Sequence, residues 1–294
     1  MKIRCFGALR IQDQLPRIIE GFKELGHEIV DENSSPYDCD LLYINDPAHA
    51  DEAESWVKPK INSNLPRLIS ILNIQDIPYH IPDFSAEKLG YQLSRFTKIT
   101  TISKTTQKDV KELTGFDSTI IYQPAQPIFQ TNEKKYNGFK YLIAGRVNDP
   151  NKRTKLFYDY LEEYGNPMDF VIVLGSEDPG FGDWQGVVSN EDLNNWYNSV
   201  DYVFCLTKYG GIELSQIEAI LAGKFPIVCN DSDVAMEFNP EFACDPSPEG
   251  IHKKIIEIEA NQAKYKQIVI EKQKDFKVKF SKIEVARKIL ELVK

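Results

Sequence analysis

The sequence predicts an α/β protein made of two doubly wound, Rossmann-like domains that face one another across a cleft. Short apolar runs of strand length alternate with amphipathic helical segments along nearly the whole chain. This alternation is typical of parallel sheets with helices on both faces. It is interrupted once by a polar stretch at residues 126–138. With 294 residues, the chain is long enough for two domains of ordinary size.

Residues 1–125 are predicted to form the N-terminal domain. The opening segment KIRCFGAL is a short apolar strand. In the helix that follows, Leu15, Ile18 and Phe22 fall on one stripe, and Gly26 ends the helix. YDCDLLYIND and LPRLISILNIQD supply further strands, and residues 98–124 predict a strand, a helix and a strand in turn.

Residues 139–294 are predicted to form the C-terminal domain, after a linker at 126–138. Strands are predicted in FKYLIAGR, DFVIVLGS, DYVFCLTK and FPIVCN, and helices in KLFYDYLEEYG, NEDLNNWYNSV and SQIEAILAG. The remainder is predicted to be helical, with the last helix packing back on the N-terminal domain. In doubly wound folds, ligands bind at the carboxyl ends of the strands.

The composition is that of a soluble globular protein, with 42% hydrophobic and 27% charged residues. No segment approaches the roughly 20 apolar residues that a membrane span needs, and the first residues lack the apolar core of a signal peptide. The five cysteines are scattered, without a CxxC pair or a histidine spaced to complete a metal site. We therefore expect a cytoplasmic protein with no transmembrane segment and no metal ion.

The charge of the chain is uneven. A net charge of −9 disfavours indiscriminate binding of nucleic acid. The stretch from His252 to Lys294 is nevertheless basic, with 12 Lys or Arg against 6 Asp or Glu. A solvated helix face is the simplest interpretation of this stretch, and a contact with DNA is the alternative.

Two segments of the second half carry candidate binding residues. In IAGRVNDPNKRTK, Arg146 ends a strand and Lys152 follows a turn, so both cations can reach phosphate oxygens at the edge of a sheet. An ordinary exposed basic loop is the alternative. In GGIELSQIEAILAG, two glycines precede a helix whose first N–H groups favour an anion. Ser215 and Glu218 in that helix are also spaced as a capping box, which is the competing interpretation.

The order of these pieces resembles the retaining GT-B glycosyltransferases of group 1, which include bacterial mannosyl-, glucosyl- and N-acetylglucosaminyl-transferases. The resemblance covers nearly the whole chain. It rests on TTISKTTQKDVKELTGFDSTIIYQPAQPIF, on IAGRVNDPNKRTK, on VVSNEDLNNWYNSVDYVFCLT and on the closing helix KFSKIEVARKILELV.

The resemblance implies a role for each candidate residue. Arg146 and Lys152 match the phosphate-binding cations, although the loop is one residue longer than usual and leaves Lys155 as an alternative to Lys152. Glu218 matches the carboxylate that accepts hydrogen bonds from the ribose hydroxyls. The donor-binding set that it implies is Gly145, Arg146, Lys152, Gly211, Leu214, Ser215 and Glu218.

The family's sugar-contacting carboxylate has no counterpart here. It is the first member of a Glu-x7-Glu pair, and counting back from Glu218 places it at Gly210. Glu213 lies in the same turn, and we expect it to contact the transferred sugar instead. Its competing interpretation is a solvent-facing carboxylate at a helix start, where the helix dipole favours it. Arg146, Lys152 and Glu213 are thus the predicted catalytic residues.

The function expected from this resemblance is retaining, metal-independent transfer of a sugar from a nucleotide sugar such as UDP-glucose or GDP-mannose, without a further cofactor. The acceptor would be a glycan, a lipid-linked sugar or a modified DNA base. Two alternatives stay open: a phage-type DNA-base glycosyltransferase of the same fold, and a GT-B epimerase or non-catalytic nucleotide-sugar-binding protein. The GT-A architecture, with its metal-binding Asp-x-Asp pair, is disfavoured because DCD at 38–40 precedes its strand and DSD at 231–233 matches a GT-B loop.

Overall fold

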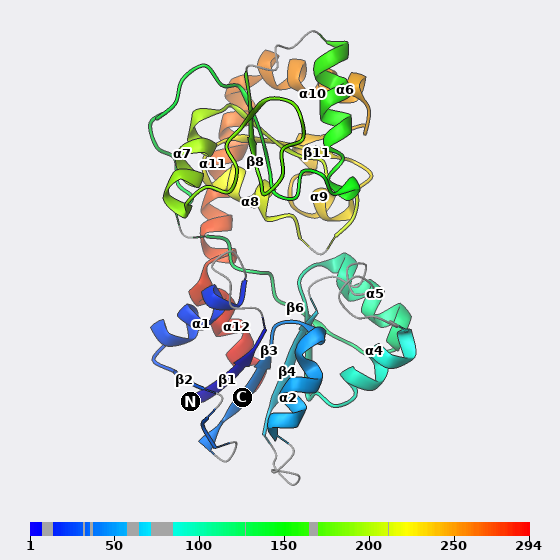
Figure 1. Cartoon of the computed structure of the whole chain (residues 1–294), viewed down its shortest axis with the longest axis vertical. Helices are drawn as coiled ribbons and strands as arrows, with labels where there is room; N and C mark the ends of the chain where they lie inside the picture. The colour runs from blue at the N-terminus through cyan, green and yellow to red at the C-terminus, as the bar shows by residue number, and fades with distance from the viewer. Residues whose placement is uncertain are drawn as a thin grey trace. The chain divides into compact units, whose positions relative to one another are not determined.

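The computed structural model describes residues 1–7, 14–31, 33–35, 38–57, 65–71, 85–126, 128–164, 170–210 and 212–294. It contains two six-stranded sheets with interleaved helices, and the paired strands are parallel (Figure 1). The predicted α/β class with two doubly wound sheets is confirmed. The chain divides into two compact units. Unit 1 comprises Met1–Pro124, Gly210–Ile212 and Lys279–Lys294, and unit 2 comprises Ala125–Tyr209 and Glu213–Val278.

The sheet of unit 1 has the strand order β2-β1-β3-β4-β5-β6. Its strands are β1 (Lys2–Phe6), β2 (Glu28–Val30), β3 (Leu41–Ile44), β4 (Arg67–Ile71), β5 (Lys98–Thr101) and β6 (Thr119–Ile120). Its helices are α1 (Gln14–Glu24), η2 (Pro47–His49), α2 (Ala50–Val57), α4 (Ala86–Leu93), α5 (Lys104–Thr114) and α12 (Lys282–Glu291).

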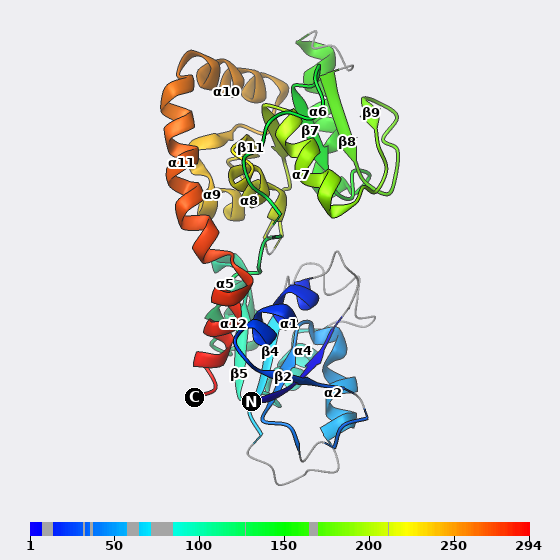
Figure 2. The ribbon, with the colours of Figure 1, turned by 90° about the vertical axis from the view of Figure 1, so that its left-hand side faces the viewer.

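Both faces of this sheet are covered by helices, as the fully apolar strand β3 requires. Leu41 and Tyr43 belong to a core cluster with residues of α1 and α12, whereas Leu42 and Ile44 belong to a second cluster with residues of α2, α4 and α5. Figure 2 shows α1 and α12 lying against one another. The last helix of the chain therefore completes the core of unit 1.

The sheet of unit 2 has the order β12-β11-β10-β7-β8-β9. Its strands are β7 (Tyr141–Ala144), β8 (Val171–Leu174), β9 (Asp183–Trp184), β10 (Tyr202–Cys205), β11 (Phe225–Cys229) and β12 (Ala243–Cys244). Its helices are η4 (Pro150–Lys152), α6 (Thr154–Glu163), α7 (Asn190–Ser199), α8 (Leu214–Leu221), α9 (Asp233–Phe238), η6 (Pro240–Phe242), α10 (Pro248–Ala260) and α11 (Gln262–Lys279), whose last residue belongs to unit 1.

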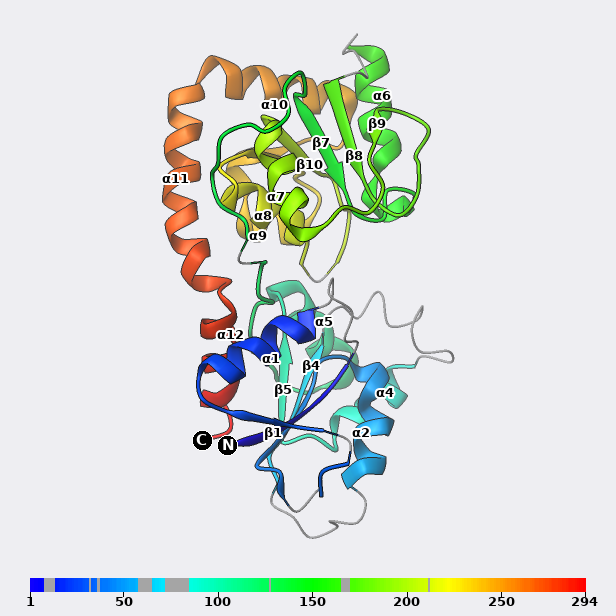
Figure 3. The same ribbon diagram turned by 60° about the vertical axis from the view of Figure 1, so that its left-hand side comes forward.

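The core of unit 2 is built around strand β10, every residue of which is buried. Helix α8 packs on β10 and β11. Phe204 of β10 lies against Phe157 of α6 with ring centroids 4.0 Å apart. Helices α6 and α10 lie side by side (Figure 3), where Tyr164 and His252 stack at 4.1 Å. These contacts bury β10, whose neighbours in the sheet are β7 and β11.

Several short elements were not expected from the sequence. Strands β9 and β12 have two residues each, which is too short for an apolar alternation to be recognised. Helix α8 begins at Leu214 and not at Ser215 as expected.

Among the described residues, no helix combines the length and the apolar character needed to cross a membrane.

The contact between α1 and α12 depends on a missing side chain. A Cβ atom at Gly21 would lie 2.3 Å from the backbone oxygen of Lys282 and 2.9 Å from the Cβ atom of Ala286. Backbone atoms cannot yield as a flexible side chain can. The close approach of the two helices therefore requires glycine at this position.

Gly21→Ala is expected to lower the free energy of unfolding by about 1–3 kcal/mol, because it overpacks this contact. Gly90 is the matched control, since it also lies inside a helix and an added Cβ would meet only Thr114 at 3.9 Å. Gly90→Ala should stabilise by about 0.5–1 kcal/mol through helix propensity. Denaturant titration of both variants measures the two effects. If Gly21→Ala stabilised the protein as Gly90→Ala does, the tight packing of α1 on α12 would be wrong.

Candidate functional site

The candidate site lies in unit 2, at the carboxyl ends of β7 and β10. Strand β7 ends at Ala144, and Gly145 follows with φ of 113°, a conformation that favours glycine. The amide of Gly145 donates to the carbonyl of Leu174 at 2.8 Å. A Cβ atom at Gly145 would lie 3.9 Å from Cε of Lys152. The turn after β7 thus starts tight against β8 and passes beside the lysine.

The turn η4 holds this lysine at a defined point. Its N-cap residue Asp149 accepts a hydrogen bond from the amide of Asn151 at 2.9 Å, and its backbone oxygen accepts one from the amide of Lys152 at 2.8 Å. The next residue, Arg153, has φ of 52°, which is uncommon for a residue with a side chain. Two hydrogen bonds to the Asp231 carboxylate, at 2.8 and 2.6 Å, hold its guanidinium. This bidentate pair supports the strained end of the turn.

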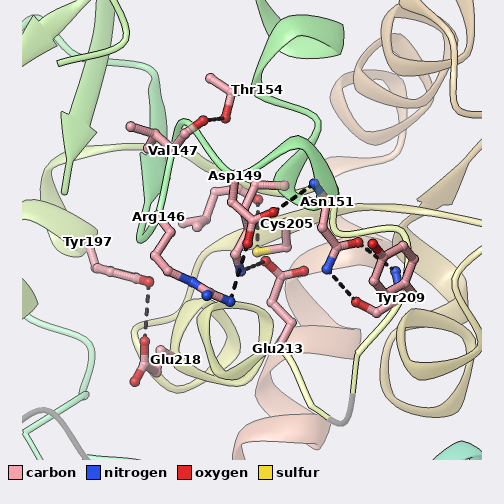
Figure 4. Close-up of polar contacts among 12 residues, drawn as sticks. Arg146, Val147, Asp149, Asn151, Thr154, Tyr197, Cys205, Tyr209, Glu213 and Glu218 are labelled. Carbon is pink, nitrogen blue, oxygen red and sulfur yellow. Dashed lines mark hydrogen bonds and ion pairs between the residues drawn. The ribbon is translucent and has the colours of Figure 1, made fainter. Parts of the chain in front are cut away.

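Asn151 ties the turn to the segment after β10. Its side-chain amide donates to the carbonyl of Tyr209 at 2.7 Å, and its side-chain oxygen accepts from the amide of Tyr209 at 3.0 Å (Figure 4). Its backbone oxygen accepts from the amide of Lys208 at 3.0 Å. Two loops that are distant in the sequence therefore share one rigid junction.

Lys152 and Glu213 form an ion pair at the centre of the site. The lysine ammonium lies 2.9 Å from the carboxylate, and the two side chains are only 22% and 9% exposed. Burial lowers the pKa of Lys152, but the charge and the hydrogen bond of Glu213 outweigh it, so that the pKa is raised. The lysine is therefore charged. The low exposure of Glu213 also excludes the solvent-facing carboxylate that the sequence left open.

Arg146 is the second cation of the site, and it is far more exposed than Lys152. Its side chain is 67% exposed and lies 3.3 Å from the Asp149 carboxylate. Such an exposed pair contributes little to stability. Figure 4 shows the Arg146 side chain extending toward Glu213, and the positive charge of Arg146 acts to lower the pKa of Lys152. Lys155, the alternative phosphate ligand, is instead 83% exposed and paired with Asp159 at 2.6 Å on its own helix.

Glu218 is buried in the second turn of α8 and 8% exposed. The hydroxyl of Tyr197 in α7 donates to its carboxylate at 3.3 Å (Figure 4). Burial raises the pKa of Tyr197 well above its ordinary value, and the negative charge of Glu218 adds to this. The capping-box interpretation is wrong, because the N-cap residue of α8 is Glu213 and the Ser215 hydroxyl accepts no capping bond.

Two buried hydroxyls lie in the segment that runs from the end of β10 to the second residue of α8. The Ser215 hydroxyl lies beside the Cys205 thiol and makes no hydrogen bond to an oxygen or nitrogen of the described residues. The Thr207 hydroxyl, two residues beyond β10, is likewise without a partner there. Buried hydroxyls are normally hydrogen-bonded. A thiol is a weak hydrogen-bonding group, so both hydroxyls can still take a further polar partner.

The structure thus brings most of the predicted site residues together. Gly145, Arg146 and Lys152 come from the turn after β7, and Glu213, Leu214, Ser215 and Glu218 from the start of α8. Gly211 lies outside the described residues. Among the residues that are described, no group of three His, Cys, Asp or Glu side chains could hold a metal ion.

Four residues of the site were not among the predicted ligands. Tyr197 lies in a helix whose sequence indicates only an apolar face, and Asn151 appears as an ordinary turn residue. Thr207 directly follows a buried strand, which is a weak positional signal. Asp231 was noted only as part of a possible metal motif, and it binds Arg153 instead.

Asn151→Ala removes both side-chain hydrogen bonds to Tyr209 and should lower the free energy of unfolding by about 1–2 kcal/mol. Asn148→Ala is the control, because Asn148 is exposed on the same loop. This control should change stability by less than about 0.5 kcal/mol. Equal stability of the two variants in denaturant titrations would show that the junction of the loops does not depend on Asn151.

Comparison with known proteins finds similarity in structure. No protein-family model matches the chain, and no curated protein sequence matches it. HepE from Anabaena in complex with UDP is 14% identical, with a TM-score of 0.76 over 99% of this chain and 98% of that one. A glycosyltransferase from Rickettsia africae ESF-5 is 15% identical, with a TM-score of 0.78 over 99% and 97%. Sucrose-phosphate synthase from Thermosynechococcus elongatus is 14% identical, with a TM-score of 0.67 over 95% and 77%.

The chain has the GT-B fold. Its two parallel sheets match those of GT-B glycosyltransferases over nearly their full length. A second structure of HepE, in complex with UDP-glucose, is 15% identical to this chain with a TM-score of 0.73. At such identities the similarity is one of fold, and the chemistry has to be argued from the site itself.

Proposed function

We propose that this chain is a retaining glycosyltransferase of the group 1 type, which transfers a sugar from a nucleoside-diphosphate sugar to an acceptor hydroxyl. The observation that carries the proposal is the buried cation Lys152, which is held beside the start of α8 by its ion pair with Glu213. An anion is favoured at such a helix start. The UDP and UDP-glucose bound to HepE, which has the same fold, support a nucleotide-sugar donor.

The leaving diphosphate is the group that this site suits best. As the glycosidic bond of the donor breaks, negative charge grows on the diphosphate oxygens. Lys152 supplies a buried cation held by its turn, Arg146 supplies an exposed one, and the N–H groups at Leu214 and Ser215 add their dipoles. Because these groups stabilise the developing charge, we propose that the reaction needs no metal ion and no further cofactor.

Glu218 is proposed to bind the ribose of the donor. Its carboxylate is buried at the same end of the sheet and held by Tyr197. A carboxylate can accept hydrogen bonds from two neighbouring hydroxyls, which is the pattern that a ribose presents. Glu213 is proposed to contact the transferred sugar in place of the carboxylate missing at Gly210.

The remaining parts of the proposal concern the acceptor. We propose that residues 1–125 form the acceptor-side domain, that residues 126–138 are a linker and that residues 139–294 bind the donor. The acceptor would be the hydroxyl of a glycan, a lipid-linked sugar or a modified DNA base. A cytoplasmic location fits donors of this kind.

The test of this function is incubation of the protein with a panel of nucleotide sugars, with and without candidate acceptors, while the release of nucleoside diphosphate is measured. Release only in the presence of an acceptor, with the anomeric configuration of the product unchanged, is expected. Interconversion of donors without an acceptor would instead identify an epimerase, and binding without either reaction a sensor. Activity lost in EDTA and restored by Mn²⁺ would contradict the metal-independent mechanism.

Arg146→Ala is expected to reduce kcat/KM by about 10- to 150-fold, because it removes charge-assisted hydrogen bonds to the leaving diphosphate. Lys155→Ala is the control, since this exposed lysine is paired with Asp159 on α6. Lys155→Ala should change kcat/KM by less than about twofold, which corresponds to about 0.4 kcal/mol. A larger loss for Lys155→Ala than for Arg146→Ala would reverse the assignment of the two cations.

Glu218→Gln should weaken binding of the free nucleoside diphosphate several-fold, because an amide accepts from only one of the two ribose hydroxyls. The same variant should bind the 2′,3′-dideoxy nucleoside diphosphate as the parent does, since the lost contact is absent from that ligand. Calorimetric titration measures both ligands. Glu162→Gln, at an exposed carboxylate of α6, controls for net charge. Equal loss of affinity for both ligands would assign Glu218 a structural role.

A further inference from the structure

The Glu213 carboxylate occupies a place that favours an anion. As the N-cap residue of α8, it could accept hydrogen bonds from the first N–H groups of the helix, yet its side chain makes no capping bond. It turns instead to Lys152, at 2.9 Å. The side chain is 9% exposed, so this ion pair is largely shielded from water. Glu213 thus neutralises the cation to which the proposed function assigns the diphosphate.

Both cations of the site are matched by a carboxylate in the same way. Arg146 lies beside Asp149, and Lys152 lies beside Glu213. Asp149 also caps the turn η4 by accepting from the amide of Asn151, so it has a structural task in addition. Glu213 has no such task among the contacts of the described residues. Among the described residues, the carboxylate of Glu213 pairs with the ammonium of Lys152.

We propose that Glu213 is a displaceable internal counter-ion, which holds Lys152 in the empty site and exchanges with the diphosphate of the donor. This inference rests on the proposed function. A diphosphate at Lys152 would bring negative charge next to a buried carboxylate, and two like charges in a poorly solvated place repel strongly. The carboxylate must therefore leave the ammonium when the diphosphate arrives. It is then free to turn to the transferred sugar.

The exchange has a consequence for product release. The nucleoside diphosphate must compete with an internal anion at every moment, so its affinity is lower than the two cations alone would provide. When the sugar has left, Glu213 returns to Lys152 and helps to expel the product. The ion pair also avoids an unpaired buried charge in the empty site, which would be costly.

Calorimetric titration with UDP and with GDP tests the proposal. Glu213→Gln keeps the size of the side chain and removes its charge. Whichever of UDP and GDP the parent binds more tightly should bind to this variant about 5- to 20-fold more tightly still. This factor lies in the lower part of the usual range for coupled sites. The inhibition constant of that nucleoside diphosphate in the transfer reaction should fall by the same factor. Glu162→Gln makes the same change of net charge at an exposed site of α6 and should leave the affinity unchanged.

If Glu213→Gln bound the nucleoside diphosphate as tightly as the parent, the exchange would be overturned. Glu213 would then be left with a contact to the transferred sugar alone. Weaker affinity would also overturn it, because Glu213 would then serve to orient Lys152 for the ligand. If Glu213→Gln fails to fold in thermal melts, Glu213→Ser provides the same comparison. The proposed function fails separately, if the parent binds neither UDP nor GDP and no nucleotide sugar of the panel reacts.

Discussion

The ion pair between Lys152 and Glu213 is the interaction on which the geometry of the site depends. It joins the turn after β7 to the start of α8, and it lies next to the junction that Asn151 makes with the segment after β10. Without this pair, neither charged side chain would be stable away from water. Because the pair is buried, removing one partner leaves the other as an uncompensated charge. The two loops are thus ordered together.

The surroundings of this pair are arranged so that charge is balanced before any ligand arrives. Arg153 is bound by Asp231, Arg146 lies near Asp149, and Lys152 is bound by Glu213. In the part of the chain that is described, the Thr207 hydroxyl has no hydrogen-bond partner and the Ser215 hydroxyl has only the Cys205 thiol. The proposed binding of a diphosphate at this site would use cations that are already in place.

The fold was largely predictable from the sequence, whereas the contacts between the candidate site residues were not. Apolar runs such as YLIA and YVFC and the helical stripe of Leu15, Ile18 and Phe22 report burial directly, since they repeat with the period of the element. Strands β9 and β12 were not predicted, because a strand of two residues is too short to show an alternation of apolar and polar residues. Lys152 and Glu213 were both chosen as site residues, but they are 61 positions apart.

No local pattern can predict that two residues so far apart form an ion pair. The same holds for Tyr197, whose hydroxyl reaches Glu218 from another helix, and for Asp231, which is separated from its partner Arg153 by four strands in the sequence. Each of these contacts depends on the order of strands in the sheet, where β7 and β11 flank β10. Local periodicity determines the elements, and the order of the strands determines which loop ends meet.

A crystal structure of the protein with UDP tests the central claim most directly, and GDP serves if the protein prefers it. The account predicts a phosphate oxygen at about 3 Å from Nζ of Lys152, an ordinary distance for a charged hydrogen bond, with the Glu213 carboxylate turned away from that ammonium. A nucleotide bound elsewhere, or bound here with the 2.9 Å contact between Lys152 and Glu213 intact, would contradict it.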